Sequence, residues 1–552
     1  MKVLVSAPPP TANGDLHVGH LSGPFLRADI LQRFCKMQGR EVYCICGADE
    51  HQSYVAYRAA QLGQTAQQAV DKFSEAIRET LEAAHIDVDL YMRPSRSPDH
   101  QKLTQEVFAA LYATGKLIAR EKPCLYCNHC ERYLFEVYVV GKCPHCGAGS
   151  CGNACEACGR PNQCVDLKDA VCNQCGQTPA TRLSTRLYFP LGEYEEKLRS
   201  YYESAVLSPR LREICEGMLK DGLPEIVMCH PADWGIPVPV PGFEGQRIYV
   251  WFEVATGLLS ASKQLSEKLD LAGGWKEFWA KAQADVVQFC GFDNGYFYGM
   301  LIPAILMAYD PDIVLPKGIL LNEFYRLDGS KFSTSRNHAI WGRELIGMAS
   351  LDAVRFYLAL SGPETEQTNF TLDEFDETVR RELISGWQEW LQDLGTRLSS
   401  DYDNVAPAVD VWNDEQRRFQ EKIEGYISEA AAAYNLAGFS PRQAARVLTA
   451  LVQATREFGE TMRRGTEESE VLQTTTALEL LAVNTLAMLA APIMPEFSAQ
   501  LFQALGNDES AKAPAWSNEM KFVAAGTVLD LEGRTYFSPV VMNQSARSSV
   551  AS

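Results

Sequence analysis

The pattern of apolar and polar positions predicts alternating strands and helices near the start of the chain. Residues 2–7 (KVLVSA) form a short apolar run that ends at prolines, which is typical of a buried parallel strand. Residues 41–48 (EVYCICGA) repeat this pattern. Residues 21–39 between them have helical apolar spacing and end at Gly39, a suitable helix stop. We therefore expect a parallel sheet with helical crossovers, beginning with a helix directly after the first strand.

The same α/β pattern returns after a cysteine-rich interval, and a long helical region follows it. Strand-like runs recur in RIYVWFEVATG, DVVQFCGFDNGYFYG and DIVLPKGILL, and from residue 376 the apolar spacing is helical. The predicted domains are an α/β domain in two halves, an insertion between them, a region with a loop rich in Gly, Ser and Lys, a helical domain and a tail. Their expected ranges are residues 1–118 and 231–320 for the halves, 119–230 for the insertion, 321–375 for the loop region, 376–535 for the helical domain and 536–552 for the tail.

Length and charge restrict the class of protein. A chain of 552 residues is too long for one hydrophobic core. Its net charge of −19 is unusual for a protein that binds nucleic acid, although an acidic net charge does not exclude a local basic face. We find no run of 18 apolar residues, and the proline-rich start does not read as a signal peptide, so we expect a cytoplasmic protein with reduced thiols and no membrane partner.

Four Cys-x2-Cys pairs predict metal binding in the insertion. Each pair places two thiolates on one tetrahedral ion, so eight cysteines predict two structural Zn²⁺ sites with no open position. We expect the two central pairs to share one ion and the outer pairs the other. Three further cysteines, Cys124, Cys151 and Cys164, and the histidines inside two of the pairs leave exchanges of ligands open. The predicted ligands are Cys127, Cys130, Cys143, Cys146, Cys155, Cys158, Cys172 and Cys175.

Two further motifs suggest chemistry on phosphates. His17 and His20 stand three residues apart just beyond the first strand, in a chain with only nine histidines. Far along the sequence, Lys331 lies among small hydroxyl residues in DGSKFSTSRN. A lysine in such a loop can close over a triphosphate and neutralise the charge that develops as pyrophosphate leaves. Either motif alone has little specificity, but their combination across a split α/β domain is specific.

These motifs resemble those of a known family. The stretch His17-Val18-Gly19-His20 matches the HIGH motif of class I aminoacyl-tRNA synthetases, and KFSTS from Lys331 to Ser335 matches their KMSKS loop. PTANGDLHVGHL, ICGADEH, DWGIPVP, YVWFE and GFDN match the methionyl enzymes of archaeal and eukaryotic type. The resemblance covers roughly residues 1–535. It implies a Rossmann catalytic domain split by the zinc-knuckle insertion and followed by a C-terminal helical bundle. It also implies that an amino acid and ATP, with Mg²⁺, give an aminoacyl-adenylate and pyrophosphate.

The resemblance also implies roles for single residues. His17 and His20 would hold the α- and β-phosphates in the transition state, and Lys331 the pyrophosphate. Asp49 would pair with the ammonium group of the amino acid. The implied ATP-binding residues are Gly19, Asp293, Asn294, Ser333 and Ser335, and the implied amino-acid-binding residues are Asp49, Thr11, Trp251, Leu258 and Tyr298.

The chain departs from the family in the side-chain pocket. Thr11 stands where the family usually has Tyr, Leu258 replaces an aromatic wall, and Tyr298 replaces a His. A methionine pocket depends on aromatic faces around the thioether, so these changes predict altered selectivity, for a smaller or more polar side chain. The alternative is that they are neutral changes within a working methionine pocket.

The helical domain departs from the family where anticodon readers are expected. Glu389, Asp393 and Arg464 take the places of an Asn, an Arg and a Trp. Carboxylates repel a phosphate backbone, so we expect that the chain does not read the methionine anticodon.

Three functions remain open at this point. The first is a methionyl-tRNA synthetase with tRNA as partner. The second is a diverged paralogue that transfers a different amino acid to a non-tRNA acceptor, for example a hydroxylamine or an amine, as in hydrazine-forming enzymes, together with a separate biosynthetic partner enzyme. The third is a non-catalytic binding module, against which the presence of His17, His20, Asp49 and Lys331 argues.

Overall fold

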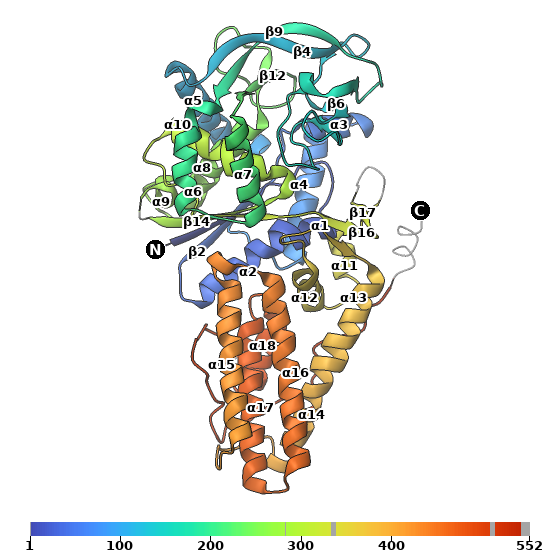
Figure 1. Cartoon of the computed structure of the whole chain (residues 1–552), viewed down its shortest axis with the longest axis vertical. Helices are drawn as coiled ribbons and strands as arrows, with labels where there is room; N and C mark the ends of the chain where they lie inside the picture. Colours follow the sequence, from blue (N-terminus) through green and yellow to red (C-terminus); the bar gives the residue numbers. More distant parts are fainter. Residues whose placement is uncertain (1, 282, 333–337, 508–513, 543–552) are drawn as a thin grey trace. The chain divides into compact units, whose positions relative to one another are not determined.

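The computed structural model describes residues 2–281, 283–332, 338–507 and 514–542 (Figure 1). The chain divides into two compact units. The first unit consists of Met1–Leu16 and Val42–Glu323, and the second of His17–Glu41 and Phe324–Ser552. The predicted domain ranges remain a prediction, and the two units are described separately below.

The core of the first unit is a six-stranded parallel sheet in the order β10-β15-β14-β1-β2-β3. This is a doubly wound order in which the direction of winding changes between β1 and β14, and ligands of such sheets bind beyond the carboxyl ends of the strands at that point. The predicted α/β fold is confirmed. The strands are β1 (Lys2–Ser6), β2 (Val42–Gly47), β3 (Leu90–Met92), β10 (Val206–Leu207), β14 (Ala284–Gly291) and β15 (Gly318–Asn322).

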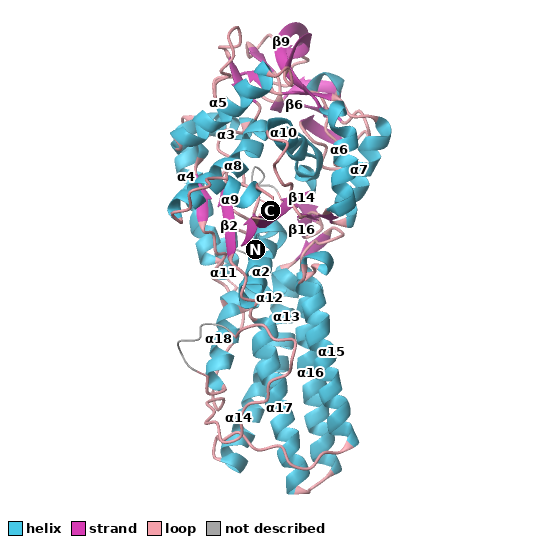
Figure 2. Ribbon diagram, turned by 90° about the vertical axis from the view of Figure 1, so that its left-hand side faces the viewer, coloured by secondary structure: helices cyan, strands magenta, loops and turns pink. Residues whose placement is uncertain are grey.

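Helices cover this sheet, as the cyan and magenta elements of Figure 2 show. The helix α8 packs on β2 and β3 and against α5, and it is buried along most of its length. The apolar run RIYVWFEVATG therefore divides into the short strand β13 (Gln246–Ile248) and the start of α8, so Trp251 lies on a helix. The helices are α3 (Ser53–Gln61), α4 (Ala66–Ala83), α5 (Pro98–Ala113), α6 (Glu195–Ser204), α7 (Pro209–Asp221), α8 (Val250–Lys268), α9 (Lys276–Trp279) and α10 (Ile302–Tyr309).

The cysteine-rich part of the first unit has sheets of its own. A four-stranded antiparallel sheet has the order β11-β9-β4-β5, and a three-stranded sheet has the order β7-β6-β8. The strands β12 and β13 form an antiparallel pair. The bounds are β4 (Ile118–Cys127), β5 (Arg132–Tyr133), β6 (Glu136–Lys142), β7 (Gly149–Gly152), β8 (Lys168–Cys172), β9 (Ala180–Pro190), β11 (Glu225–Val227), β12 (Cys229–Pro231) and β13 (Gln246–Ile248).

The second unit is mainly helical, as predicted for the C-terminal region. The helices α15, α16 and α17 pack against one another and run side by side in both views (Figures 1 and 2). Ion pairs with buried carboxylates join distant segments: Arg355 pairs with Asp29 at 2.6 Å, and Arg397 pairs with Glu479 at 2.9 Å. The helices are α11 (Gly342–Ile346), α12 (Leu351–Ser361), α13 (Leu372–Thr378), α14 (Glu389–Tyr402), α15 (Asp414–Tyr434), α16 (Pro441–Gly465), α17 (Ser469–Ala490) and α18 (Pro495–Ala504), with a π-helical segment, Val379–Gln388, before α14.

The helix expected after the first strand is interrupted. A three-residue helix α1 (Val18–His20) leads into a π-helical turn (Leu21–Phe25), and the regular helix α2 (Leu26–Met37) starts only there. Gly23 has non-helical backbone angles and Pro24 follows it, which breaks the helix. The predicted stop is confirmed, because Gly39 has φ +73°. In the part of the chain that the structure describes, no helix is both long and apolar enough to cross a bilayer.

Candidate active site

Residues that follow the carboxyl ends of β1 and β2 lie side by side in the first unit. The backbone N–H of Asp49 donates to the carbonyl oxygen of Pro10 at 2.8 Å, and that of Ala12 donates to the carbonyl of Asp49 at 3.2 Å. These bonds hold Thr11 next to Asp49. Two residues predicted to bind the amino acid are thus brought together from neighbouring strands.

A small pocket opens beside Asp49. Its volume is about 40 Å³, and Asp49, His100, Glu253 and Leu258 are among its lining residues. Most of the wall is apolar, with contributions from Ala7, Pro9, Ile45, Met92, Val254 and Ala261. Asp49 and Leu258, both predicted to bind the amino acid, therefore line one pocket. The wall of that pocket is mainly apolar and includes the Asp49 carboxyl group.

Burial determines the electrostatics of Asp49. The side chain is 7% exposed. Burial and the nearby charge of Glu253 raise the pKa of Asp49 well above its ordinary value. An ammonium group in the pocket would favour the ionised carboxylate and offset this cost.

Sequence reasoning missed the second carboxylate of this pocket. The Oε1 atom of Glu253 lies 2.7 Å from Nδ1 of His51 and 3.1 Å from Nε2 of His100. The two histidines hold the pKa of Glu253 at about 2 despite its burial, so this side chain is ionised at neutral pH. Its Oε2 atom and Nδ1 of His100 are buried without a hydrogen-bond partner among the described residues. Both atoms belong to residues that line the pocket.

Trp251 and Tyr298 pack together in the core. The two rings lie 6.3 Å apart in an edge-to-face arrangement, and Trp251 also stacks on Phe297 at 3.7 Å. Tyr298 is fully buried, and burial raises the pKa of its hydroxyl well above the ordinary value. Both side chains lie outside the wall of the small pocket. Their assignment to amino-acid binding remains a prediction.

His17 and His20 form a reciprocal cap in the second unit. The N–H of His17 donates to Nδ1 of His20 at 3.2 Å, and the N–H of His20 donates to Nδ1 of His17 at 3.3 Å. The imidazole rings stack at 3.7 Å. Burial lowers the pKa of His17 well below its ordinary value, and the charges of His20 and Lys331 lower it further.

Lys331 and its neighbour complete the described part of this cluster. The phenyl ring of Phe332 stacks on the His17 imidazole with the ring centroids 4.6 Å apart. The His17 ring therefore contacts both Phe332 and His20. Lys331 lies in β17 (Ser330–Lys331), which forms a hairpin with β16 (Tyr325–Leu327), and its ammonium lies 4.7 Å from the Phe324 ring centroid. The lysine expected on a loop is therefore on a short strand.

The predicted ATP-binding residues are placed differently. Gly19 lies between the two histidines, where a Cβ atom would come within 3.1 Å of the His17 ring and 3.2 Å of the Phe332 ring. Asp293 and Asn294 form a single turn of 3₁₀-helix directly after β14, at the switch point of the first unit's sheet. Ser333 and Ser335 lie outside the described residues.

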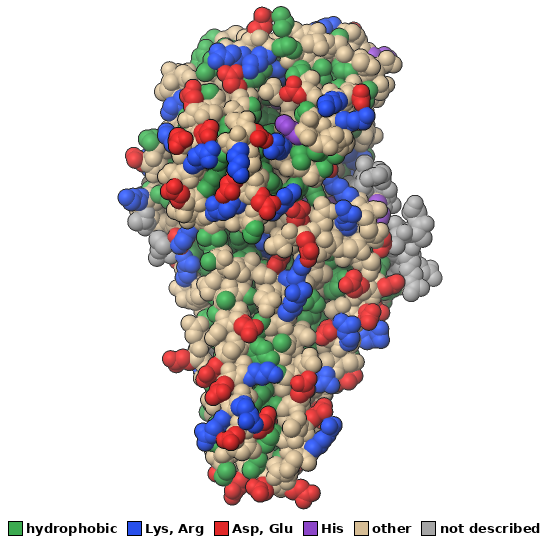
Figure 3. All heavy atoms as spheres, in the orientation of Figure 1, with side chains coloured by type: hydrophobic (Ala, Val, Ile, Leu, Met, Phe, Trp, Pro, Cys, Tyr) green, Lys and Arg blue, Asp and Glu red, His purple; other side chains and the backbone are tan. Residues whose placement is uncertain are grey.

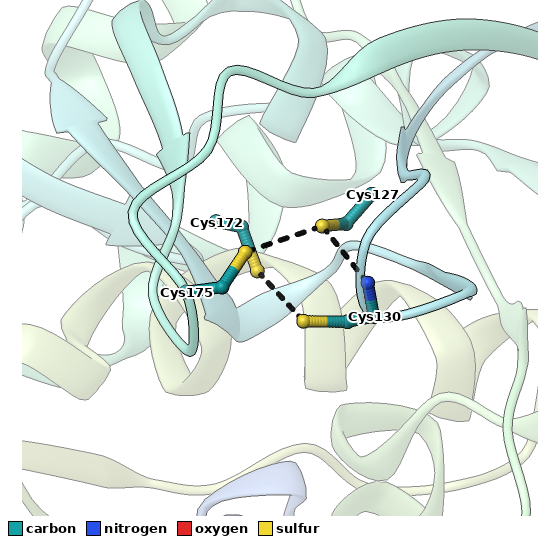
Figure 4. A group of neighbouring side chains, drawn as sticks. All are labelled: Cys127, Cys130, Cys172 and Cys175. Carbon is teal, nitrogen blue, oxygen red and sulfur yellow. Dashed lines mark hydrogen bonds between the residues drawn. The ribbon is translucent and has the colours of Figure 1, made fainter.

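The eight predicted zinc ligands form two groups of four. Cys127, Cys130, Cys172 and Cys175 make one group (Figure 4), and Cys143, Cys146, Cys155 and Cys158 make the other, with the sulfurs of each group within 4.8 Å of one another. The structure thus has the expected pairing, central with central and outer with outer.

The spacing of the sulfur atoms tests whether zinc fits. Sulfur–sulfur distances of 3.5 and 3.9 Å occur in the first group, and of 3.9 and 3.7 Å in the second. A tetrahedron with Zn–S bonds of about 2.3 Å has edges of about 3.8 Å, so both groups fit the ion. All seventeen cysteines lie in the described part of the chain, and there none of them forms a disulfide.

The residues expected at the anticodon-reading places are exposed. Glu389 and Asp393 lie on α14, and Asp393 pairs with Arg397 at 3.0 Å. Arg464 lies in the last turn of α16, with its side chain 81% exposed, and pairs with Glu460 at 3.3 Å.

Comparison with known proteins decides the family. The family model of the class I tRNA synthetases (M) matches residues 3–393. A methionine–tRNA ligase of Thermococcus kodakarensis is 33% identical over 535 residues, which cover 94% of this chain and 72% of that one. The chain belongs to the class I tRNA synthetases.

Other relatives of this synthetase agree. A methionine–tRNA ligase of Thermomicrobium roseum is 31% identical over 90% of this chain and 85% of its own length. Among solved structures, a Mycobacterium tuberculosis methionyl-tRNA synthetase in complex with methionyl-adenylate matches with a TM-score of 0.78. That match covers 97% of this chain and all of the other at 19% identity, so it supports the fold alone. The synthetase is a ligase of the methionyl type, as the resemblance implied.

Proposed function

We propose that this synthetase activates an amino acid with MgATP, forming an aminoacyl-adenylate and releasing pyrophosphate. The observation that carries the proposal is the reciprocal cap of His17 and His20, beside which Lys331 contributes a positive charge. Because each Nδ1 accepts a backbone hydrogen bond, each ring carries a proton on Nε2 and can donate it to a phosphate oxygen. Donors that are fixed before charge develops stabilise a transition state most effectively.

In this proposal the other residues position the two substrates. Asp49 pairs with the ammonium group of the amino acid, and Leu258 and its apolar neighbours contact the side chain. Asp293 and Asn294 contact the nucleotide beyond β14. The carboxylate of the amino acid attacks the α-phosphorus, the bond to the β-phosphate oxygen breaks, and Lys331 neutralises the departing pyrophosphate. The thiolates of each four-cysteine group hold a structural Zn²⁺ ion.

Methionine is the first candidate substrate, because the relatives named above are methionine–tRNA ligases. The small volume beside Asp49 and the unpartnered Oε2 of Glu253 also suit a short side chain with a hydrogen-bond donor. Such a side chain would leave no buried acceptor unsatisfied. Methionine and an amino acid with a short, hydrogen-bonding side chain are thus the two candidate substrates, and pyrophosphate exchange with each amino acid distinguishes them.

We propose tRNA as the acceptor, with the anticodon not read by Glu389, Asp393 and Arg464. On the face drawn in Figure 3, basic and acidic side chains are interspersed, and a mixed surface attracts a phosphate backbone less than a basic one does. The alternative, transfer to a non-tRNA acceptor with a separate partner enzyme, rests on the sequence departures alone. The proposed compartment is the cytoplasm, because thiolate ligands require reducing conditions.

The test of the proposal is amino-acid-dependent exchange of pyrophosphate into ATP. We expect exchange by the wild-type chain and its loss in His20→Ala, while bound zinc and the fold stay intact. Equal exchange by His20→Ala and the wild type would overturn the assigned mechanism.

A further inference from the structure

Another pocket lies within the first unit. Its volume is about 590 Å³, within the usual range for small-molecule sites. Arg186, Cys164 and His230 are among its lining residues, together with parts of β11 and of the loop after β7. None of the catalytic, nucleotide-binding or amino-acid-binding residues predicted above lines it.

Arg186 is a buried cation without an ion-pair partner. It lies on β9, is 8% exposed, and its Nε atom has no hydrogen-bond partner in the described part of the chain. No carboxylate of the described residues forms an ion pair with it. A guanidinium group keeps its charge at any physiological pH, so burial without a counter-charge costs free energy.

The neighbouring acidic groups do not supply that charge. Glu225 pairs with Lys122 at 2.7 Å and with Arg120 at 3.1 Å. Asp221 pairs with Arg160 at 2.7 Å. The third acidic lining residue, Asp166, is exposed to solvent.

The cysteines near Arg186 remain neutral as well. Burial raises the pKa of Cys164 and of Cys229 to about 12, and it also raises that of Cys124. These thiols lie outside both four-cysteine groups. They are therefore protonated at neutral pH and do not balance the guanidinium.

His230 supplies a second polar group without a partner. It is 7% exposed, its ring stacks on Phe135 at 4.6 Å, and its Nε2 atom has no hydrogen-bond partner among the described residues. Burial and the charge of Arg186 lower its pKa well below the ordinary value, so the ring is neutral and can donate one hydrogen bond.

We propose that this pocket binds a small oxyanion, a carboxylate or a phosphate group, through the Arg186 guanidinium and Nε2 of His230. The planar guanidinium donates two parallel hydrogen bonds to either kind of group. The aromatic side chains of Tyr249, Tyr296 and Phe297 line the same pocket and can cover an attached organic group. Because Phe297 stacks on Trp251, a ligand here would contact the aromatic packing next to the amino-acid pocket.

The experiment measures the melting temperature of the full zinc-loaded chain in sodium phosphate, sodium acetate and sodium chloride at equal ionic strength. We expect a saturable rise in melting temperature with phosphate, acetate or both, beyond that in chloride. The rise should vanish in Arg186→Gln and persist in Arg182→Gln. Arg182 is a matched control, because it lies on the same strand but is exposed and donates to Asn128 at 2.8 Å.

Two further variants separate this proposal from its alternatives. The rise in melting temperature with the oxyanion must persist in His20→Ala. A rise caused by phosphate bound at the proposed catalytic cluster would be lost in that variant. His230→Leu should raise the half-saturating anion concentration about tenfold. This variant tests the site independently of Arg186→Gln and replaces that variant if it does not fold. In the sodium chloride buffer, without phosphate or acetate, Arg186→Gln should melt at or above the wild-type temperature, because an unbalanced buried charge is removed. The proposal is overturned if the wild type responds equally to all three salts, or if Arg186→Gln keeps the full response.

Discussion

Each of the two imidazoles of His17 and His20 accepts a hydrogen bond from the backbone N–H of the other residue, at 3.2 and 3.3 Å. This relationship fixes the tautomer of both rings, because an Nδ1 that accepts a hydrogen bond carries no proton. The lowered pKa of His17 keeps that ring neutral at neutral pH. The motif thus presents Nε2–H donors whose direction is set by the backbone.

Replacing one ring separates the cap from the donor. The amide of Asn reaches about as far as Nδ1 and can accept the backbone N–H, while that of Gln reaches about as far as Nε2. We therefore expect His20→Asn to melt like the wild type but to lose about 10²–10³-fold in pyrophosphate exchange. His20→Gln should retain more of the exchange activity than His20→Asn. The reverse order of the two variants would contradict the assigned tautomer.

Gly19 lies so close to the rings of His17 and Phe332 that no side chain fits there. A Cβ atom there would meet the His17 ring at 3.1 Å and the Phe332 ring at 3.2 Å. We expect Gly19→Ala to lower kcat/KM for exchange about 100-fold by displacing the imidazole. Gly425 on α15 is the control, because its Cβ would meet nothing within 4 Å. Gly425→Ala should keep full activity and gain up to about 1 kcal/mol of stability, and equal activity of both variants would refute the steric argument.

The raised pKa of Asp49 predicts a pH-dependent affinity for the amino acid. Burial and the charge of Glu253 raise this pKa, so the carboxyl group takes up a proton at higher pH than an ordinary aspartate. Lowering the pH through this pKa removes the partner of the substrate ammonium. We expect KM for the amino acid to rise as the pH is lowered, while KM for ATP changes little. In Asp49→Asn the KM should be high throughout, and a KM for the amino acid in the wild type that is independent of pH would count against the assignment.

The cysteine groups predict a specific loss of metal. Cys146 belongs to one of the two groups of four, whereas Cys151 lies outside them, with its sulfur 2.9 Å from the Tyr54 hydroxyl. We expect Cys146→Ala to lower bound zinc from two ions per chain to one and to destabilise the insertion, since a structural site contributes folding energy. Cys151→Ala should keep both ions in a zinc assay. Two ions retained by Cys146→Ala would show that the site uses another ligand.

Features encoded by local pattern could be predicted from the sequence. The apolar runs of β1, β2, β14 and β15 point to buried parallel strands because polar and apolar residues do not alternate regularly within them. The Cys-x2-Cys pairs indicate metal because both ligands come from one turn. Periodicity failed at Pro24, where apolar spacing continues through a break in the backbone hydrogen bonds. It also could not divide the run around Trp251 between strand and helix, because a short apolar run fits both.

The polar network of the pocket could not be predicted in the same way. His51 and Glu253 are 202 residues apart, and His100 and Glu253 are 153 apart, so no spacing rule joins them. The matching stretches ICGADEH and YVWFE contain His51 and Glu253, but only the fold brings them together.

The most direct measurement of the central claim is ATP–pyrophosphate exchange by the wild-type chain with each of the twenty amino acids, with and without tRNA. We expect exchange that depends on one amino acid. Methionine alone would mean that Thr11, Leu258 and Tyr298 are neutral changes, and a smaller or more polar amino acid would mean that they remodel the pocket. Exchange with none of the twenty, in the presence or absence of tRNA, would contradict the activation of an amino acid by this chain.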